Sequence, residues 1–298
     1  MHFMQKTHLL RSLRLYITGF CMGMADLIPG VSGGTIAFVS GIYEDLLSSI
    51  NVATGQALRL LLRGNILSAF RAIPFSFFIP LGLGIGSAIF GLAHALSWLL
   101  EHHPQPVWGF FFGLVLASTV IVIKRVARWQ ARYIFAFLLS TVGAFLLVGL
   151  SPVETPVTWW MIFLSGMIAI CAMILPGISG SFILLLLGKY RQMLAAVVEK
   201  DFLTLIIFFA GCIIGISFFS RFLSWLFKHY HDISVAILAG VMLGSVRKIW
   251  PWQIQNQLAL PNQANGTTAL VILCILAGCA LVLWLDRFKF IKEHTTGR

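Results

Sequence analysis

The chain has 298 residues, of which 59% are hydrophobic and 10% are charged, and its net charge at pH 7 is +11. Soluble globular domains are about 45–50% apolar and about 25% charged, so a water-soluble fold could not cover this chain with polar surface. The basic residues stand in short clusters between apolar runs and are not gathered into one patch with interleaved aromatic residues. This pattern argues against a nucleic-acid partner and is typical of an integral membrane protein.

The first apolar stretch runs from Leu15 to Tyr43 and is interrupted in its middle. Its only charge is Asp26, which is followed by Pro29, Gly30 and two further glycines. Two full crossings need about 40 residues, and one unbroken helix could not contain the interruption. We therefore expect a re-entrant helical hairpin over about residues 15–50, with a tight hairpin that spans the membrane as the alternative.

Six further stretches are long and apolar enough to cross a membrane as helices, which takes about 20 residues. Three follow the first interruption, at about 73–100, 106–123 and 132–150, after a predicted loop over 51–72. A second interrupted stretch at about 157–198 contains Pro176 and Gly177, and three more spans follow at about 203–227, 233–249 and 268–286. The predicted fold class is all-α, a polytopic membrane protein.

The two interrupted stretches are copies of one unit. A shift of 147 positions aligns ten identical residues over 29 positions, where apolar composition alone would give about three. We predict two repeats, 1–150 and 151–298, each with one re-entrant hairpin and three transmembrane helices. An odd number of crossings reverses the chain, so the second repeat is expected to be inverted, as in many secondary transporters.

The placement of charge predicts the orientation. Sixteen of the 21 lysine and arginine residues fall on the side of the two termini, which the positive-inside rule assigns to the cytoplasm. The other five are Lys189, Arg191, Lys200, Arg247 and Lys248. Their side chains either snorkel to the interface or, in the case of Lys189, Arg247 and Lys248, form an outer vestibule that attracts an anionic headgroup.

Both interruptions have the composition of an anion site. Pro29, Gly30, Pro176 and Gly177 are the predicted structural breaks, after which a helix restarts with its N–H groups and positive dipole end aimed at a cavity. The candidate phosphate-binding residues are Ser32, Gly33, Gly34, Thr35, Ser179, Gly180 and Ser181. The alternative is a pair of kinks packed closely through glycine.

Asp26 is the one acidic residue set inside an apolar run. An intramembrane acid is a candidate for carrying a coupling proton or sodium ion, or for pairing with an arginine. Its counterpart in the second repeat is Met173, so the two copies differ at this position. Glu44 and Arg191, which are equivalent positions in the two repeats, are further candidates for coupling or charge pairing. No cofactor or metal site is expected, and no enzyme signature is present.

Residues 23–38, GMADLIPGVSGGTIAF, and GIYE at 41–44 resemble the bacterial polyprenyl-phosphate transporter family, and MILPGISGS at 173–181 is similar to its partner motif. The resemblance implies a flippase in the bacterial cytoplasmic (inner) membrane. It would return undecaprenyl phosphate, the lipid carrier of cell-wall and surface-glycan synthesis, from the outer to the inner leaflet by alternating access. The implied partners are the polyprenyl-phosphate lipid and membrane lipids, with a proton or sodium ion as candidate coupling ion.

Two other functions are weighed against this one. A small-anion transporter or channel could use the same paired helix N-termini without any gap toward lipid. A membrane enzyme acting on lipid phosphates would need a nucleophile or an acid–base pair, which the sequence does not offer convincingly.

Overall fold

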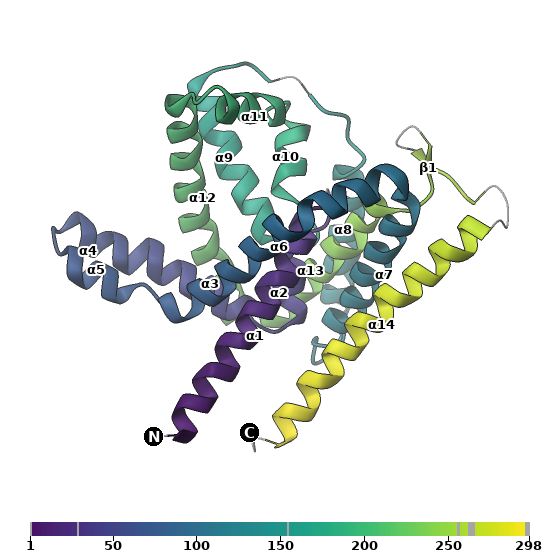
Figure 1. Cartoon of the computed structure of the whole chain (residues 1–298), viewed down its shortest axis with the longest axis horizontal. Helices are drawn as coiled ribbons and strands as arrows, with labels where there is room; N and C mark the ends of the chain where they lie inside the picture. The colour runs from purple at the N-terminus through teal and green to yellow at the C-terminus, as the bar shows by residue number, and fades with distance from the viewer. Residues whose placement is uncertain (1, 29, 154, 255–256, 262–265, 296–298) are drawn as a thin grey trace.

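The computed structural model describes residues 2–28, 30–153, 155–254, 257–261 and 266–295, and almost all of them are helical (Figure 1). Within these residues, four helices are long and apolar enough to cross a membrane, namely α6 (Phe75–His102), α7 (Pro104–Ile123), α12 (Phe202–His229) and most of α14 (Gly266–Thr295). The all-α polytopic membrane fold is therefore confirmed. Within the described residues, the departure from it is a two-strand antiparallel hairpin before α14, formed by β1 (Gln253–Ile254) and β2 (Gln257–Leu258).

The first half begins with one long helix and two short ones. α1 (His2–Asp26) ends at the first break, and α2 (Gly33–Val39) and α3 (Tyr43–Asn51) follow it. Gly41 joins α2 to α3 with a positive φ of 72°, a conformation that costs glycine nothing.

The loop predicted over 51–72 is wrong, because this segment is helical. A π-helical turn (Val52–Ala57), α4 (Leu58–Leu62) and α5 (Ile66–Ala72) occupy it. Its arginines are separated by leucine and alanine, which favour helix, and Asn65 caps α5 by accepting a hydrogen bond from the amide of Ser68 at 3.2 Å. α6, α7 and α8 (Ala131–Leu147) complete this half.

The second half also has a long helix, a break, two short helices and three longer helices in this order, without counterparts of α4 and α5. α9 (Trp159–Ile174) ends at the second break, and α10 (Gly180–Leu186) and α11 (Tyr190–Val198) follow, with a bend of 107° between them. α12, α13 (His231–Ser245) with the 3-10 turn Val246–Ile249, and α14 complete it. Both chain ends lie at one end of the molecule, and α11 lies at the opposite end (Figure 1).

Glycine allows two helix pairs to approach closely. α1 packs on α6 and α9 packs on α12. A side chain at Gly19 would overlap the carbonyl of Leu81, and one at the equivalent Gly166 would overlap the carbonyl of Phe208. The same close packing thus holds each long helix before a break against the next long helix of its half.

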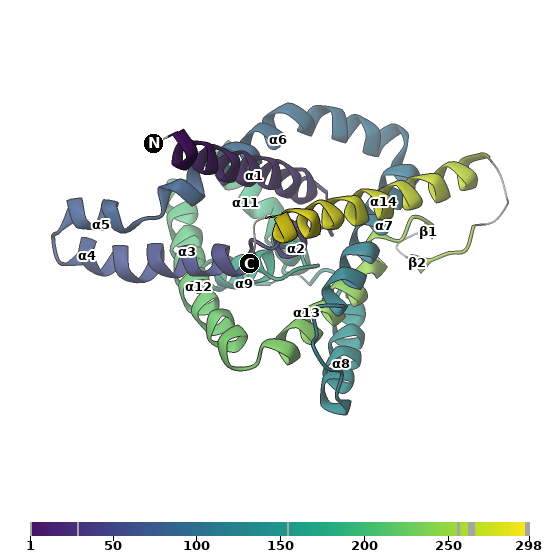
Figure 2. The same cartoon turned by 90° about the horizontal axis from the view of Figure 1, so that it is seen from below.

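The remaining helices exchange partners between the halves. α7 of the first half packs on α14 of the second, and α13 of the second half packs on α8 of the first (Figure 2). α7 and α13 also contact each other, so these four helices form one core. The two halves are consequently interlocked rather than laid side by side.

Candidate functional site

The two breaks lie against each other in the interior. The Ser32 hydroxyl is within hydrogen-bonding distance of two carbonyl oxygens of the second break, those of Met173 (3.3 Å) and Leu175 (3.2 Å). The Gly177 amide donates to the hydroxyl oxygen of Thr35 at 3.0 Å. Ser32 and Thr35 are only 1% and 0% exposed. These bonds satisfy backbone groups that the breaks leave without helical partners, as burial away from water requires.

The N-terminus of α2 is occupied by side chains of the protein itself. A carboxylate oxygen of Asp26 accepts from the Gly33 amide at 2.7 Å, and the Ser32 hydroxyl oxygen accepts from the Gly34 amide at 3.1 Å. A side chain at Gly33 would overlap the Asp26 carboxylate, which explains the glycine there. In the part of the chain that the structure describes, no lysine or arginine forms an ion pair with Asp26. Asp26 therefore acts here as a helix cap that complements the positive end of α2.

The N-terminus of α10 lacks this cap. Met173 stands where the first half has Asp26, and no side chain accepts a hydrogen bond from the first amides of α10. The hydroxyls of Ser179 and Ser181 lie 2.7 Å apart and bond to each other. Ser179 and Gly180 are buried, whereas Ser181 is exposed. The start of α10 thus keeps its positive dipole end available to an anion, with the hydrogen-bonded pair of hydroxyls beside it.

Lys248 brings a positive charge to the same place. Its ammonium nitrogen lies 5.1 Å from the ring centroid of Phe182, in the first turn of α10. Gly30, with a φ of 91°, packs so closely on the aliphatic part of Lys248 that a side chain at position 30 would overlap it. Among the described residues, Lys248 has no acidic partner. One partly buried ammonium group therefore lies beside both breaks.

The other two residues of the predicted vestibule hold backbone carbonyls. Lys189 is 1% exposed, and its ammonium donates to the carbonyls of Thr155 (2.9 Å) and Pro156 (2.8 Å). Arg247 donates to the Phe145 carbonyl at 3.0 Å, and its guanidinium lies 4.5 Å from the centroid of the Phe145 ring. These charges tie loops and helix ends together, whereas Lys248 faces the breaks.

The structure does not join Glu44 to Arg191. Glu44 is exposed, and one of its carboxylate oxygens lies 3.9 Å from the imidazole of His231. Arg191 is exposed on α11.

The predicted structural breaks include Pro176, which lies in the turn that ends at Gly177. The φ of Gly177 is 94°, positive like that of Gly30. Pro29 lies outside the described residues.

A polar cluster between α3 and α12 was missed by the sequence analysis. The Asn51 amide donates to the Ser224 hydroxyl at 2.7 Å, and its oxygen accepts from the Ser220 hydroxyl at 2.7 Å. The cluster lies beside a cavity of about 510 Å³ that is also lined by Glu44 and Lys228. A lone asparagine close to an apolar run was the available signal, and the π-helical turn that follows it is a feature frequent at functional sites.

Comparison with known proteins places the chain in a family. A family model described as undecaprenyl phosphate translocase-like matches residues 22–268, which include both breaks. The chain belongs to the undecaprenyl phosphate translocase-like family. The polyprenyl-phosphate transporter of Vibrio cholerae is 40% identical over 298 aligned positions, which cover 93% of this chain and 96% of the relative. The polyprenyl-phosphate transporter of Staphylococcus aureus is 30% identical over 254 positions, which cover 79% and 85%. No solved structure matches the chain.

Membership in this family has consequences for whether the protein is an enzyme and for where a substrate site is expected. The relatives are named as transporters, which confirms the expectation that the protein is not an enzyme. In transporters, substrate sites are typically built where interrupted helices meet near the middle of the membrane. The two breaks of this chain meet in the interior, and among the described residues Ser181 and Lys248 are polar groups near them whose side chains donate to no backbone carbonyl.

Proposed function

We propose that the protein is a flippase that moves undecaprenyl phosphate from the outer to the inner leaflet of the bacterial cytoplasmic membrane. The returned lipid carrier is then reused in cell-wall and surface-glycan synthesis. The family description and the names of the two relatives support the substrate class. The observation that carries the proposal is the uncapped N-terminus of α10, which lies beside two hydroxyls and the ammonium of Lys248.

The phosphate is held first at α10. Backbone N–H groups at a helix start, hydroxyl donors and an ammonium group are the ligands that phosphate prefers. Ser179, Gly180 and Ser181 supply the first two kinds, and Lys248 supplies the charge. Ser32, Gly33, Gly34 and Thr35 hold bonds within the protein in this conformation. They reach the phosphate only after the breaks separate and Asp26 leaves Gly33, a step that a proton or sodium ion on Asp26 would favour.

Alternating access follows from how the helices pair. Repeats 1–150 and 151–298 are inverted in this proposal, with both termini in the cytoplasm and α11 at the outer face. Because α7, α8, α13 and α14 interlock the halves, this core stays together. The pairs α1–α6 and α9–α12, each with its break, move against the core and open the site to one leaflet at a time.

The test measures the movement of undecaprenyl phosphate in liposomes that contain the purified protein, with headgroup accessibility followed over time. Wild type is compared with Lys248→Gln and with the double variant Ser179→Ala/Ser181→Ala. Loss of one charge-assisted hydrogen bond is expected to slow movement at least about tenfold. The matched controls are Lys200→Gln, at an exposed residue, and Ser217→Ala, at a half-buried residue of α12, and both are expected to keep the wild-type rate.

The same liposomes separate the lipid flippase from the small-anion alternative. Well-folded wild-type protein that moves no lipid, with or without ion gradients, but carries chloride or inorganic phosphate would support the small-anion function. Lipid movement that is equal in wild type and in both site variants would reject the site at α10 while keeping the flippase.

A further inference from the structure

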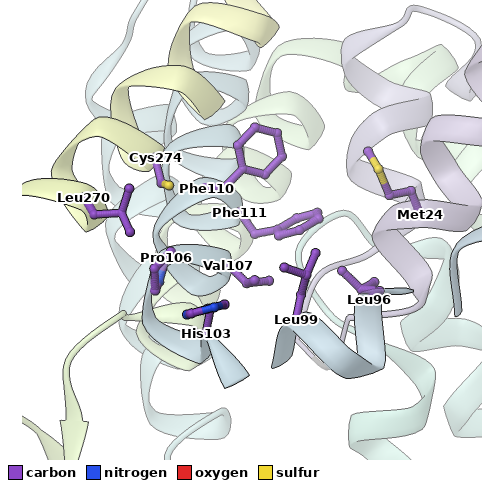
Figure 3. A pocket seen from close by; sticks show the side chains of 10 residues that line it. All are labelled: Met24, Leu96, Leu99, His103, Pro106, Val107, Phe110, Phe111, Leu270 and Cys274. Atoms are coloured by element: carbon purple, nitrogen blue, oxygen red, sulfur yellow. The ribbon is translucent and has the colours of Figure 1, made fainter. Parts of the chain in front are cut away.

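An apolar cavity of about 480 Å³ lies between α1, α6, α7 and α14. Figure 3 shows Phe111, Leu99 and Met24 directed toward one another across it, with Leu270 and Cys274 of α14 on the other side. Apart from the imidazole of His103 and the thiol of Cys274, the side chains that line the cavity are apolar. Its size falls within the range of ligand pockets, about 300–1,000 Å³.

The side chains that line the cavity determine which kind of ligand it can bind. A soluble anion entering this space loses water and finds only the imidazole of His103 and the Cys274 thiol as side-chain donors in return. A hydrocarbon gains from every apolar contact. The cavity is therefore suited to a chain of carbon atoms, and its volume holds a few isoprene units rather than a long polyprenyl chain.

Two chain segments link the lining of the cavity to the site at the breaks. Met24 lies on α1 two residues before Asp26, the cap of α2. On α7, Phe111 lines the cavity, and the next residue, Phe112, contacts the ring of Trp250 with 5.2 Å between centroids. Trp250 follows Lys248 by two residues. Neighbouring side chains of α7 thus face the cavity and the segment that carries the ammonium group.

We infer that this cavity receives the isoprene units nearest the phosphate when a polyprenyl phosphate binds, an inference that rests on the proposed function. The phosphate then lies at the breaks, the first units fill the cavity, and the remainder of the chain stays in the bilayer. The cavity makes the site selective for a phosphate that carries an apolar chain. It also distinguishes the protein from a carrier of small anions.

Photocrosslinking tests the position of the chain. Polyprenyl phosphate with a diazirine in the second isoprene unit is incorporated into liposomes with the wild-type protein, irradiated, and the labelled peptides are identified by mass spectrometry. Labels are expected on residues 106–111 of α7 and 270–274 of α14. Excess unlabelled polyprenyl phosphate should suppress them, whereas excess phosphatidylglycerol should not. Labelling that phosphatidylglycerol suppresses equally would show ordinary bilayer lipid in the cavity and overturn the inference.

A matched pair of variants tests the consequence for binding. Leu270→Trp fills part of the cavity, and Leu273→Trp adds the same indole to an exposed position of α14 outside the lining. Displacing as few as two buried chain carbons is expected to raise the apparent KM for polyprenyl phosphate about tenfold in Leu270→Trp only. Leu270→Phe serves where the larger substitution does not fold.

The outcomes separate this inference from the proposed function. Wild type that moves no polyprenyl phosphate would overturn both. Wild type that moves the lipid, together with a wild-type KM in a folded Leu270 variant and labels outside the cavity, would overturn the cavity assignment alone.

Discussion

Replacing Thr35 by valine tests the contact between the two breaks. Valine has nearly the shape of threonine, so Thr35→Val removes the hydroxyl oxygen that accepts from the Gly177 amide at 3.0 Å and changes little else. Thr35 is 0% exposed and Gly177 is buried, so water has no access to replace the lost acceptor.

The expected cost follows from this burial. A buried N–H group left without an acceptor costs about 1–3 kcal/mol of unfolding free energy. The matched control is Thr119→Val, because Thr119 is 1% exposed and its hydroxyl donates only to the Val115 carbonyl of its own helix at 2.9 Å. That carbonyl keeps its helical partner, so the control loses at most about 1 kcal/mol.

The assay is unfolding by SDS in mixed micelles, followed by tryptophan fluorescence. Thr35→Val is expected to be less stable than Thr119→Val by about 1–2 kcal/mol. Equal losses in the two variants would show that the bond between the breaks contributes nothing. The stabilising role assigned to the Thr35–Gly177 hydrogen bond would then be refuted.

Three further changes test the packing and the charges around the site. Gly84→Ala should prevent α1 from packing on α6, because the new methyl group would overlap the Tyr16 carbonyl. The control Gly82→Ala should be tolerated, because a methyl group there meets nothing within 4 Å. Size-exclusion profiles in detergent that are alike for the two variants would contradict this prediction. Lys189→Met should speed hydrogen exchange of the Val153 amide, which donates to the Leu186 carbonyl, about tenfold or more, since the nearby carbonyls of Thr155 and Pro156 lose a charge-assisted donor. Unchanged exchange would show that the lysine is not needed there. Arg125→Gln should lower the unfolding free energy by about 0.5–2 kcal/mol, because the guanidinium donates to the Val39 carbonyl at the end of α2. Arg125→Lys keeps the charge and should lower the unfolding free energy by less. A larger loss of stability in Arg125→Lys than in Arg125→Gln would refute the role of the charge.

Much of the helical layout could be predicted because it depends on local composition. An apolar run of sufficient length must form a helix in lipid, where each backbone group needs a partner within the segment. A Pro-Gly pair followed by serine must interrupt that helix and allow it to restart. The helices that begin at Gly33 and Gly180 are where this reasoning predicts them. The loop predicted over 51–72 is helical instead, because its leucine and alanine residues favour helix.

The chemistry of the candidate site could be predicted only in part. The sequence showed that Met173 replaces Asp26 in the second copy, which indicated that the two breaks differ. It did not show that the Asp26 carboxylate would cap α2, because that bond depends on how the chain turns between residues 26 and 33. Lys189 and Lys248 look alike in the sequence, yet one holds two carbonyls and the other faces the breaks.

By itself, the sequence determined that this is a membrane protein with two similar interrupted helices, because hydropathy and the demands of backbone hydrogen bonding act over short distances along the chain. Only the tertiary structure decided which distant groups meet. Thr35 and Gly177 are separated by 142 positions, and the exchange of partners between α7–α14 and α8–α13 spans the two halves. The apolar cavity likewise needs four helices from different parts of the chain. Such contacts depend on how whole helix surfaces fit together, and no local pattern records that fit.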